Sequence, residues 1–235
     1  MTLYPVAFVS LGPGEAELIT LKGLKTLQSA EWIFCPYTCT TSGNKTSRAM
    51  DILTELGIGD TRLRLFEVPM NKDRSAAMEG YSAVSGEIAE YYKTGRRIAV
   101  AVEGDASFYS SIRHMGDVLA ANDIPVETVA GVPAFIACGA LANIHIVKQD
   151  ERLYIAPGTV TLDELKKRLE KGDTVVVMKL SQCEDAIKQA ITMLENVDFH
   201  YFENAGIAGK EFYSCDKEII SNRLFPYFSL MIIRS

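Results

Sequence analysis

The sequence predicts an α/β protein of two domains: a mostly parallel five-stranded sheet with helices on both faces, then a smaller mixed sheet. In the first half, short apolar runs alternate with helical patterns, which is typical of a parallel sheet covered by helices. In the second half three strand-like segments follow one another without an intervening helix, so neighbours among them should be antiparallel. The 235 residues suit one large domain or two small ones. We place the boundary between domains 1–130 and 131–235.

Five apolar runs are the predicted strands of the first domain, and helical patterns lie between them. The clearest helix covers residues 74–95, where Ala77, Tyr81 and Ile88 share one face at helical spacing and Gly95 closes the C-terminus. The predicted strands are residues 5–11, 31–36, 62–68, 97–102 and 126–129.

The second domain begins with a small, apolar segment at residues 131–144, which predicts a buried helix. Two capping boxes, Thr161 with Glu164 and Ser181 with Glu184, predict the starts of the next two helices. After the second of these helices the sequence predicts strands alone. The helices are residues 162–171 and 184–195, and the strands are 152–156, 174–180, 199–203, 211–214 and 228–234.

Charge and cysteine content narrow the class of protein. A net charge of -6 argues against a general nucleic-acid binder, and it means that a polyanionic ligand needs a local basic patch. The five cysteines form no CxxC pair, which favours a reducing compartment over a disulfide framework. The start of the chain does not resemble a signal peptide, and no window of apolar residues is long enough to span a membrane. We therefore expect a cytoplasmic protein without a metal site.

A glycine-rich turn, Gly12-Pro13-Gly14, joins the first strand to a helical pattern. A dinucleotide loop would need a third glycine where Glu17 stands, and a P-loop would need Gly-Lys-Ser/Thr. Glu15 and Glu17 would also repel a phosphate. Two readings remain open, a tight structural turn or a corner where a ligand must approach the bare backbone.

A second cluster, Glu103-Gly104-Asp105, lies at the C-terminal tip of the fourth predicted strand. Ligands of parallel sheets bind beyond these tips, where an acidic side chain can accept hydrogen bonds from hydroxyls or an amine. The alternative is that Asp105 only caps a helix beginning near Ser107.

Together these segments resemble the tetrapyrrole methylases, the class III S-adenosylmethionine-dependent methyltransferases. The Gly-Pro-Gly loop with residues 18–34 looks like the first signature of the family, and "EGDASFYSS" looks like its Gly-Asp-Pro signature, although Ser10 stands where a glycine is common. Residues 125–135, "VVVMK" and "FENAG" are similar to three later signatures, in the same order along the whole chain. "EVPMNKD", "VEGD", "VMKLS" and "PYFSLMII" most resemble the branch that methylates C-20 of precorrin-2.

The resemblance implies a homodimer that binds S-adenosylmethionine in a trough between the two domains. It also implies methyl transfer to C-20 of precorrin-2 or cobalt-factor II in cobalamin biosynthesis, and we assign no catalytic base. Two alternatives stay open: a family member acting at another ring position or on uroporphyrinogen III, and a cofactor-binding relative without catalysis. The implied cofactor contacts are Pro13, Glu103, Gly104, Asp105, Phe108, Pro133, Ala134, Met178 and Ala205, and the implied substrate contacts are Gly12, Gly14, Lys72 and Arg74.

Read alone, Met178 would more often be core filler than a ligand contact, and only the resemblance favours the second reading. The tetrapyrrole substrate is a polycarboxylate, so we further expect a basic rim at the C-terminal edge of the parallel sheet. Lys45, Arg48 and Arg113 are expected to form this rim with Lys72 and Arg74.

Overall fold

The computed structural model describes residues 2–39, 43–69 and 75–235. The chain divides into two compact units, Met1–Pro133 and Ala134–Ser235. Gly131 lies in the first unit, where its N–H donates a 2.6 Å hydrogen bond to the carboxylate of Asp105. The expected boundary, between residues 130 and 131, lies just before this division.

The five strands predicted for the first unit are present and pair in parallel, in the order β4-β2-β5-β1-β6. A short extra strand, β3, pairs antiparallel with the end of β2. Its two residues are exposed and polar, so no apolar pattern could predict it. The strands are β1 (Val6–Ser10), β2 (Trp32–Cys39), β3 (Lys45–Thr46), β4 (Leu63–Glu67), β5 (Ile98–Val102) and β6 (Val126–Val129).

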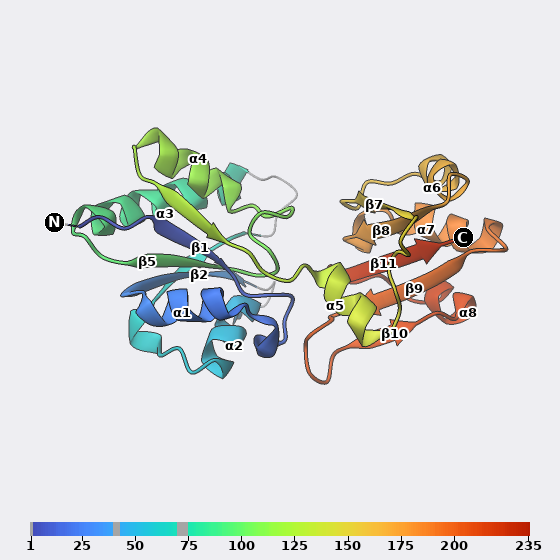
Figure 1. Ribbon diagram of the computed structural model, residues 1–235, viewed down its shortest axis with the longest axis horizontal. Helices are drawn as coiled ribbons and strands as arrows, with labels where there is room; N and C mark the ends of the chain where they lie inside the picture. Colours follow the sequence, from blue (N-terminus) through green and yellow to red (C-terminus); the bar gives the residue numbers. More distant parts are fainter. Residues whose placement is uncertain (1, 40–42, 70–74) are drawn as a thin grey trace. The chain divides into compact units, whose positions relative to one another are not determined.

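Helices cover both faces of this sheet, as predicted, with α1 and α2 on one face and α3 and α4 on the other (Figure 1). All residues of β1 are buried because its side chains alternate between two cores: Phe8 packs on the α3 side, and Ala7 and Val9 pack on the other. Thr20 caps α1 through the Gly23 amide, so this helix begins later than the Gly-Pro-Gly turn suggests. The helices are α1 (Leu21–Ser29), α2 (Arg48–Glu55), α3 (Ser75–Lys93) and α4 (Arg113–Ala121), with 3₁₀ turns η1 (Ala16–Leu18) and η2 (Asp60–Arg62).

The second unit holds a five-stranded mixed sheet in the order β10-β9-β11-β8-β7. The last three strands pair antiparallel with their neighbours, as predicted, and β11 also pairs antiparallel with β8. Only β7 and β8 pair in parallel, and α6 connects them. The strands are β7 (Arg152–Ala156), β8 (Asp173–Met178), β9 (Asp198–Glu203), β10 (Phe212–Ser214) and β11 (Ser229–Arg234).

The helices of the second unit confirm one of the two capping predictions and contradict the other. The Thr161 hydroxyl accepts a 3.2 Å hydrogen bond from the Glu164 amide and so caps α6, as predicted. The prediction for Ser181 was wrong, because this residue lies inside a 3₁₀ turn and Cys183 directly precedes α7. The elements are α5 (Ala134–Leu141), α6 (Leu162–Leu169), η3 (Leu180–Gln182), α7 (Glu184–Met193) and α8 (Lys217–Ser221).

Two further predictions for these helices were wrong. The sequence reading missed α8, which is only five residues long and starts with Asp216 as its cap. The prediction that residues 131–144 form a buried helix overstated its burial, because Ile136 and Leu141 of α5 keep 47% and 45% of their surface exposed. In the described residues no helix has the length and apolar character needed to cross a membrane.

Candidate functional site

The two signature loops of the first unit are joined directly to one another. Gly12, after β1, and Gly104, after β5, form an antiparallel bridge. The distance from the Gly12 nitrogen to the Gly104 oxygen is 3.1 Å, and that from the Gly104 nitrogen to the Gly12 oxygen is 2.7 Å. Both residues have positive φ, +83° and +73°, which glycine adopts without the strain of a side chain. The backbone conformation therefore explains why glycine stands at both Gly12 and Gly104.

A third loop, which follows β6, packs against Ser10 and Gly104. A Cβ added at Gly131 would lie 2.4 Å from the Ser10 Cβ and 2.9 Å from the Gly104 oxygen. Ser10 is fully buried, and its hydroxyl accepts a 2.8 Å hydrogen bond from the Ala106 amide. The serine that replaces the common glycine therefore holds the loop after β5, and the sequence reading did not foresee this role.

Asp105 links the loop after β5 to the loop after β6. One carboxylate oxygen accepts hydrogen bonds from the amide and hydroxyl of Ser107, at 2.8 and 2.5 Å, and the other accepts from the Gly131 amide. Burial alone would raise the pKa of Asp105, but these hydrogen bonds hold it below its ordinary value. The alternative that Asp105 caps a helix near Ser107 was wrong, because α4 begins at Arg113.

Arg48, the first residue of α2, also connects the two signature loops. Its guanidinium donates a 3.0 Å hydrogen bond to the Pro13 carbonyl and lies 3.1 Å from the Glu103 carboxylate. Burial raises the pKa of Glu103, and the positive charge of Arg48 opposes that rise. Only 14% of the Arg48 side chain is exposed, so its charge faces these two loops, and its place in a basic rim stays a prediction.

The remaining rim candidates differ in their surroundings. Arg113 is well exposed and lies 3.7 Å from Asp117, one helical turn further along α4. Lys45 is exposed and sits 4.5 Å above the Tyr37 ring. The two substrate candidates Lys72 and Arg74 lie outside the described residues.

In the second unit, Met178 is the last residue of β8 and is half-buried. Gly158, in the loop after β7, lies close to the C-terminal end of β8. A Cβ on Gly158 would be 2.8 Å from the Met178 oxygen and 2.9 Å from the Lys179 oxygen. The sequence reading missed Gly158, although a Pro-Gly pair directly after a strand is a signal for such a tight approach.

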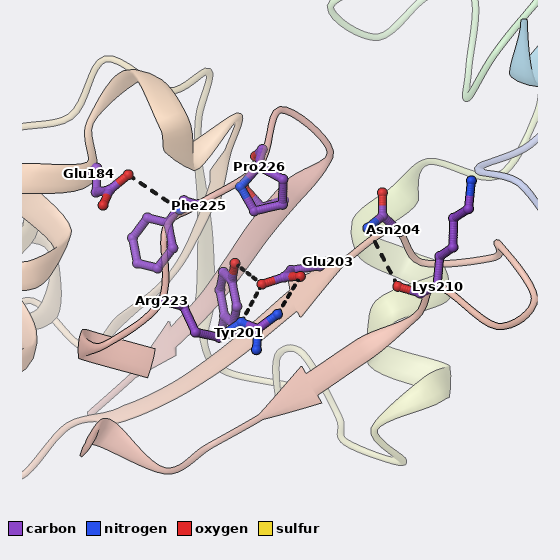
Figure 2. A network of polar contacts seen from close by, with 9 residues as sticks. Glu184, Tyr201, Glu203, Asn204, Lys210, Arg223, Phe225 and Pro226 are labelled. Carbon is purple, nitrogen blue, oxygen red and sulfur yellow. Dashed lines mark hydrogen bonds and ion pairs between the residues drawn. The ribbon is translucent and has the colours of Figure 1, made fainter. Parts of the chain in front are cut away.

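Ala205 follows β9, and the base of its loop is fixed by a partly buried ion pair (Figure 2). Arg223 holds both carboxylate oxygens of Glu203, at 2.6 and 2.9 Å, and the Tyr201 hydroxyl donates to one of them at 2.5 Å. Burial alone would raise the pKa of Glu203, but Arg223 and Tyr201 hold it below its ordinary value. The sequence reading missed this pair because Arg223 lies in a segment without a helical or strand pattern.

The predicted site residues thus fall into two sets, one in each compact unit. The structure brings together Gly12, Pro13, Glu103, Gly104 and Asp105 in the first unit. Gly14, Phe108 and Pro133 also belong to the first unit, and Ala134, Met178 and Ala205 belong to the second.

A family model described as tetrapyrrole (corrin/porphyrin) methylases matches residues 5–218. The chain is 29% identical to a Sinorhizobium protein named precorrin-2 C(20)-methyltransferase, with 96% of this chain and 93% of that protein covered. It is 23% identical to a Salmonella typhimurium protein named cobalt-precorrin-2 C(20)-methyltransferase, with 96% and 94% covered.

Among solved structures, the fold is similar to uroporphyrin-III C-methyl transferase from Thermus thermophilus complexed with S-adenyl homocysteine. The TM-score is 0.66 at 15% identity, and 99% of this chain and 98% of that chain are covered. The match of the family model to most of the chain shows that this protein is a member of the tetrapyrrole (corrin/porphyrin) methylase family.

Proposed function

We propose that the protein is an S-adenosylmethionine-dependent methyltransferase that methylates C-20 of precorrin-2, or of its cobalt-containing form, in cobalamin biosynthesis. The observation that carries this proposal is the similarity to a precorrin-2 C(20)-methyltransferase along nearly the whole of both chains. A relative named for the cobalt-containing substrate is also similar over its whole length. In this proposal any cobalt belongs to the substrate ring.

The residues present fit the proposed cofactor. Apart from its two chain neighbours, a Cβ added at Gly104 would meet no atom of the described residues within 4 Å, so the surface beside the Glu103-Gly104-Asp105 loop is open to a ligand. The backbone of this loop is fixed by the bridge to Gly12, and the Glu103 side chain keeps 31% of its surface exposed. Such a carboxylate suits the hydroxyls or the ammonium group of S-adenosylmethionine.

The chemistry requires positioning more than an activated nucleophile. S-adenosylmethionine supplies a methyl group on a sulfonium, which is already a strong electrophile. The work of the protein is to align the methyl group with the carbon that receives it and to exclude water, and such positioning supplies a large part of many enzymatic accelerations. We assign this work to the loops at Gly12-Pro13-Gly14 and Glu103-Gly104-Asp105, with Met178 and Ala205 as contacts from the second unit.

We also propose that the protein is a homodimer and works in the cytoplasm. The exposed side chains of Ile136 and Leu141 on α5 support a shared surface at that helix. The five cysteines are free, which suits a reducing compartment. Sedimentation at micromolar concentration should give the mass of a dimer, and a monomer would contradict the first of these proposals.

Turnover with a panel of substrates tests the proposed activity. The protein is incubated with S-adenosylmethionine and, separately, precorrin-2, its cobalt-containing form and uroporphyrinogen III. We expect a mass gain of one methyl group on at least one of the first two rings. Methylation of uroporphyrinogen III alone would place the protein in another branch of the family, and binding of the cofactor without turnover on any ring would identify a non-catalytic relative.

A further inference from the structure

Arg48 occupies a position that its charge alone would not favour. It is the first residue of α2, where the helix dipole is positive, and its guanidinium is mostly buried. Burial lowers the pKa of Arg48, and the negative charges of Glu103 and Asp51 oppose that shift. A buried cation at a helix N-terminus needs such compensating negative charges. The groups that Arg48 contacts therefore indicate what it does.

Arg48 contacts both loops of the candidate site. Together with the Gly12–Gly104 bridge, its contacts close a ring: the Pro13 carbonyl, the guanidinium, the Glu103 carboxylate and the bridged backbone. One planar guanidinium can hold a carbonyl and a carboxylate at the same time in a fixed relative position, which a lysine ammonium cannot reproduce.

The base of the Arg48 side chain is itself fixed to the sheet. Ser47 donates a 2.5 Å hydrogen bond to the Pro36 carbonyl near the end of β2, and its hydroxyl caps α2 through the Met50 amide. The start of α2 is thus attached to β2, and the guanidinium reaches the loops after β1 and β5 from this anchored point.

We propose that Arg48 is a positioning residue of the methyl-transfer site, which acts through Glu103 and the Pro13 carbonyl. It sets the separation of the two signature loops and holds the Glu103 carboxylate in place for the ligand. This inference rests on the proposed function, because it assigns Glu103 to the cofactor.

Calorimetric binding of S-adenosylhomocysteine tests the inference without turnover. We expect Arg48→Met to raise the Kd about tenfold, and Arg48→Lys to raise it less, since the lysine keeps the charge but not the fork. The matched control is Arg62→Met. Arg62 donates to the carbonyls of Leu27, Gln28 and Ala30 around the end of α1, so its loss should lower the melting temperature and leave the Kd unchanged.

Coupling to Glu103 separates positioning from general stability. Glu103→Gln alone should weaken binding. The double variant Arg48→Met/Glu103→Gln should lose less than the sum of the two single effects, because Arg48 acts partly through that carboxylate and partly through the Pro13 carbonyl. In Arg48→Met the Kd should also depend more strongly on pH than in the wild type and should fall as the pH rises. In that variant Glu103 lacks the positive charge that opposes the rise of its pKa on burial, so it ionises only at higher pH. Asp51, another charged neighbour of Arg48, is unchanged. The double variant should lack this pH dependence.

The outcomes distinguish the inference from the function on which it rests. A folded Arg48→Met protein with the wild-type Kd, or strictly additive effects in the double variant, would overturn the role of Arg48 and leave the proposed function standing. If Arg48→Met does not fold, Arg48→Lys and Glu103→Gln decide: wild-type binding by both overturns the inference. Wild-type protein that does not bind S-adenosylhomocysteine would overturn the proposed function and the inference with it.

Discussion

The Gly131 amide lies 2.6 Å from a carboxylate oxygen of Asp105, and this hydrogen bond ties the loop after β6 to the loop after β5. The other oxygen of Asp105 is held by Ser107. Asp105 is 8% exposed, so its hydrogen bonds are shielded from water. A residue that the sequence suggests for ligand binding is therefore also a structural link between two loops.

Asp105→Asn should destabilise the first unit even without a ligand. The amide oxygen can still accept from Ser107, but the amide NH2 would face the N–H of Gly131, and two donors cannot bond. We expect a loss of about 1–3 kcal/mol in unfolding free energy, measured by urea denaturation. Asp117→Asn, on the exposed surface of α4, is the control and should have almost no effect. Equal stability of the two variants would show that the Gly131 contact contributes nothing.

Gly131→Ala should disturb the contact between the three loops. Its Cβ would meet the Ser10 Cβ and the backbone oxygen of Gly104, so we expect a loss of about 1–3 kcal/mol in unfolding free energy. Adding Ser10→Gly removes one of the two clashes, and the double variant should be less destabilised than the sum of the single variants.

The control for this prediction is Gly86→Ala, at an exposed position of α3 where a Cβ has open space. Alanine is the better helix former there, so this variant should gain about 0.5–1 kcal/mol. A Gly131→Ala protein as stable as the wild type would contradict the packing described at Ser10.

Arg223→Met should destabilise the second unit by leaving the Glu203 carboxylate buried without its cation. Because Arg223 keeps 37% of its side chain exposed, we expect a cost of about 1–2 kcal/mol rather than the larger cost of a fully buried pair. Arg152→Met, at an exposed position of β7, provides a control for the loss of a surface arginine. Thermal unfolding of both variants at neutral pH gives the comparison.

The same ion pair predicts a pH dependence with a definite sign. Because the pKa of Glu203 is lowered in the folded protein, its stabilising contribution is complete above the unfolded value of about 4.3 and is lost as the pH falls through the folded value. The stability difference between wild type and Glu203→Gln should therefore be constant from neutral pH down to about pH 5 and shrink in stronger acid. A difference that grows on acidification would contradict this assignment.

The sequence predicts the framework of the fold because its signals are local. The apolar runs of β1 and β5 and the helical spacing of α3 come from neighbouring residues, as does the Thr161 cap, and the structure confirms each of them. The prediction at Ser181 was wrong because a 3₁₀ turn competes for the same residues.

The contacts that hold the candidate site together join residues far apart in the chain. Asp105 and Gly131 lie 26 residues apart, and no periodic pattern links Arg48 to Glu103 or Arg223 to Glu203. Family resemblance indicates which loops matter, but the hydrogen bonds between those loops depend on strand order and loop conformation, and so appear only in the folded chain.

The position of the transferred methyl group tests the central claim most directly. The protein is incubated with precorrin-2 or its cobalt-containing form and with S-adenosylmethionine carrying a carbon-13-labelled methyl group, and the product is examined by NMR. We predict a single labelled methyl group on C-20, with loss of the C-20 proton. A labelled methyl group at any other ring position, or a product without label, would contradict the assignment of this protein as a C-20 methyltransferase.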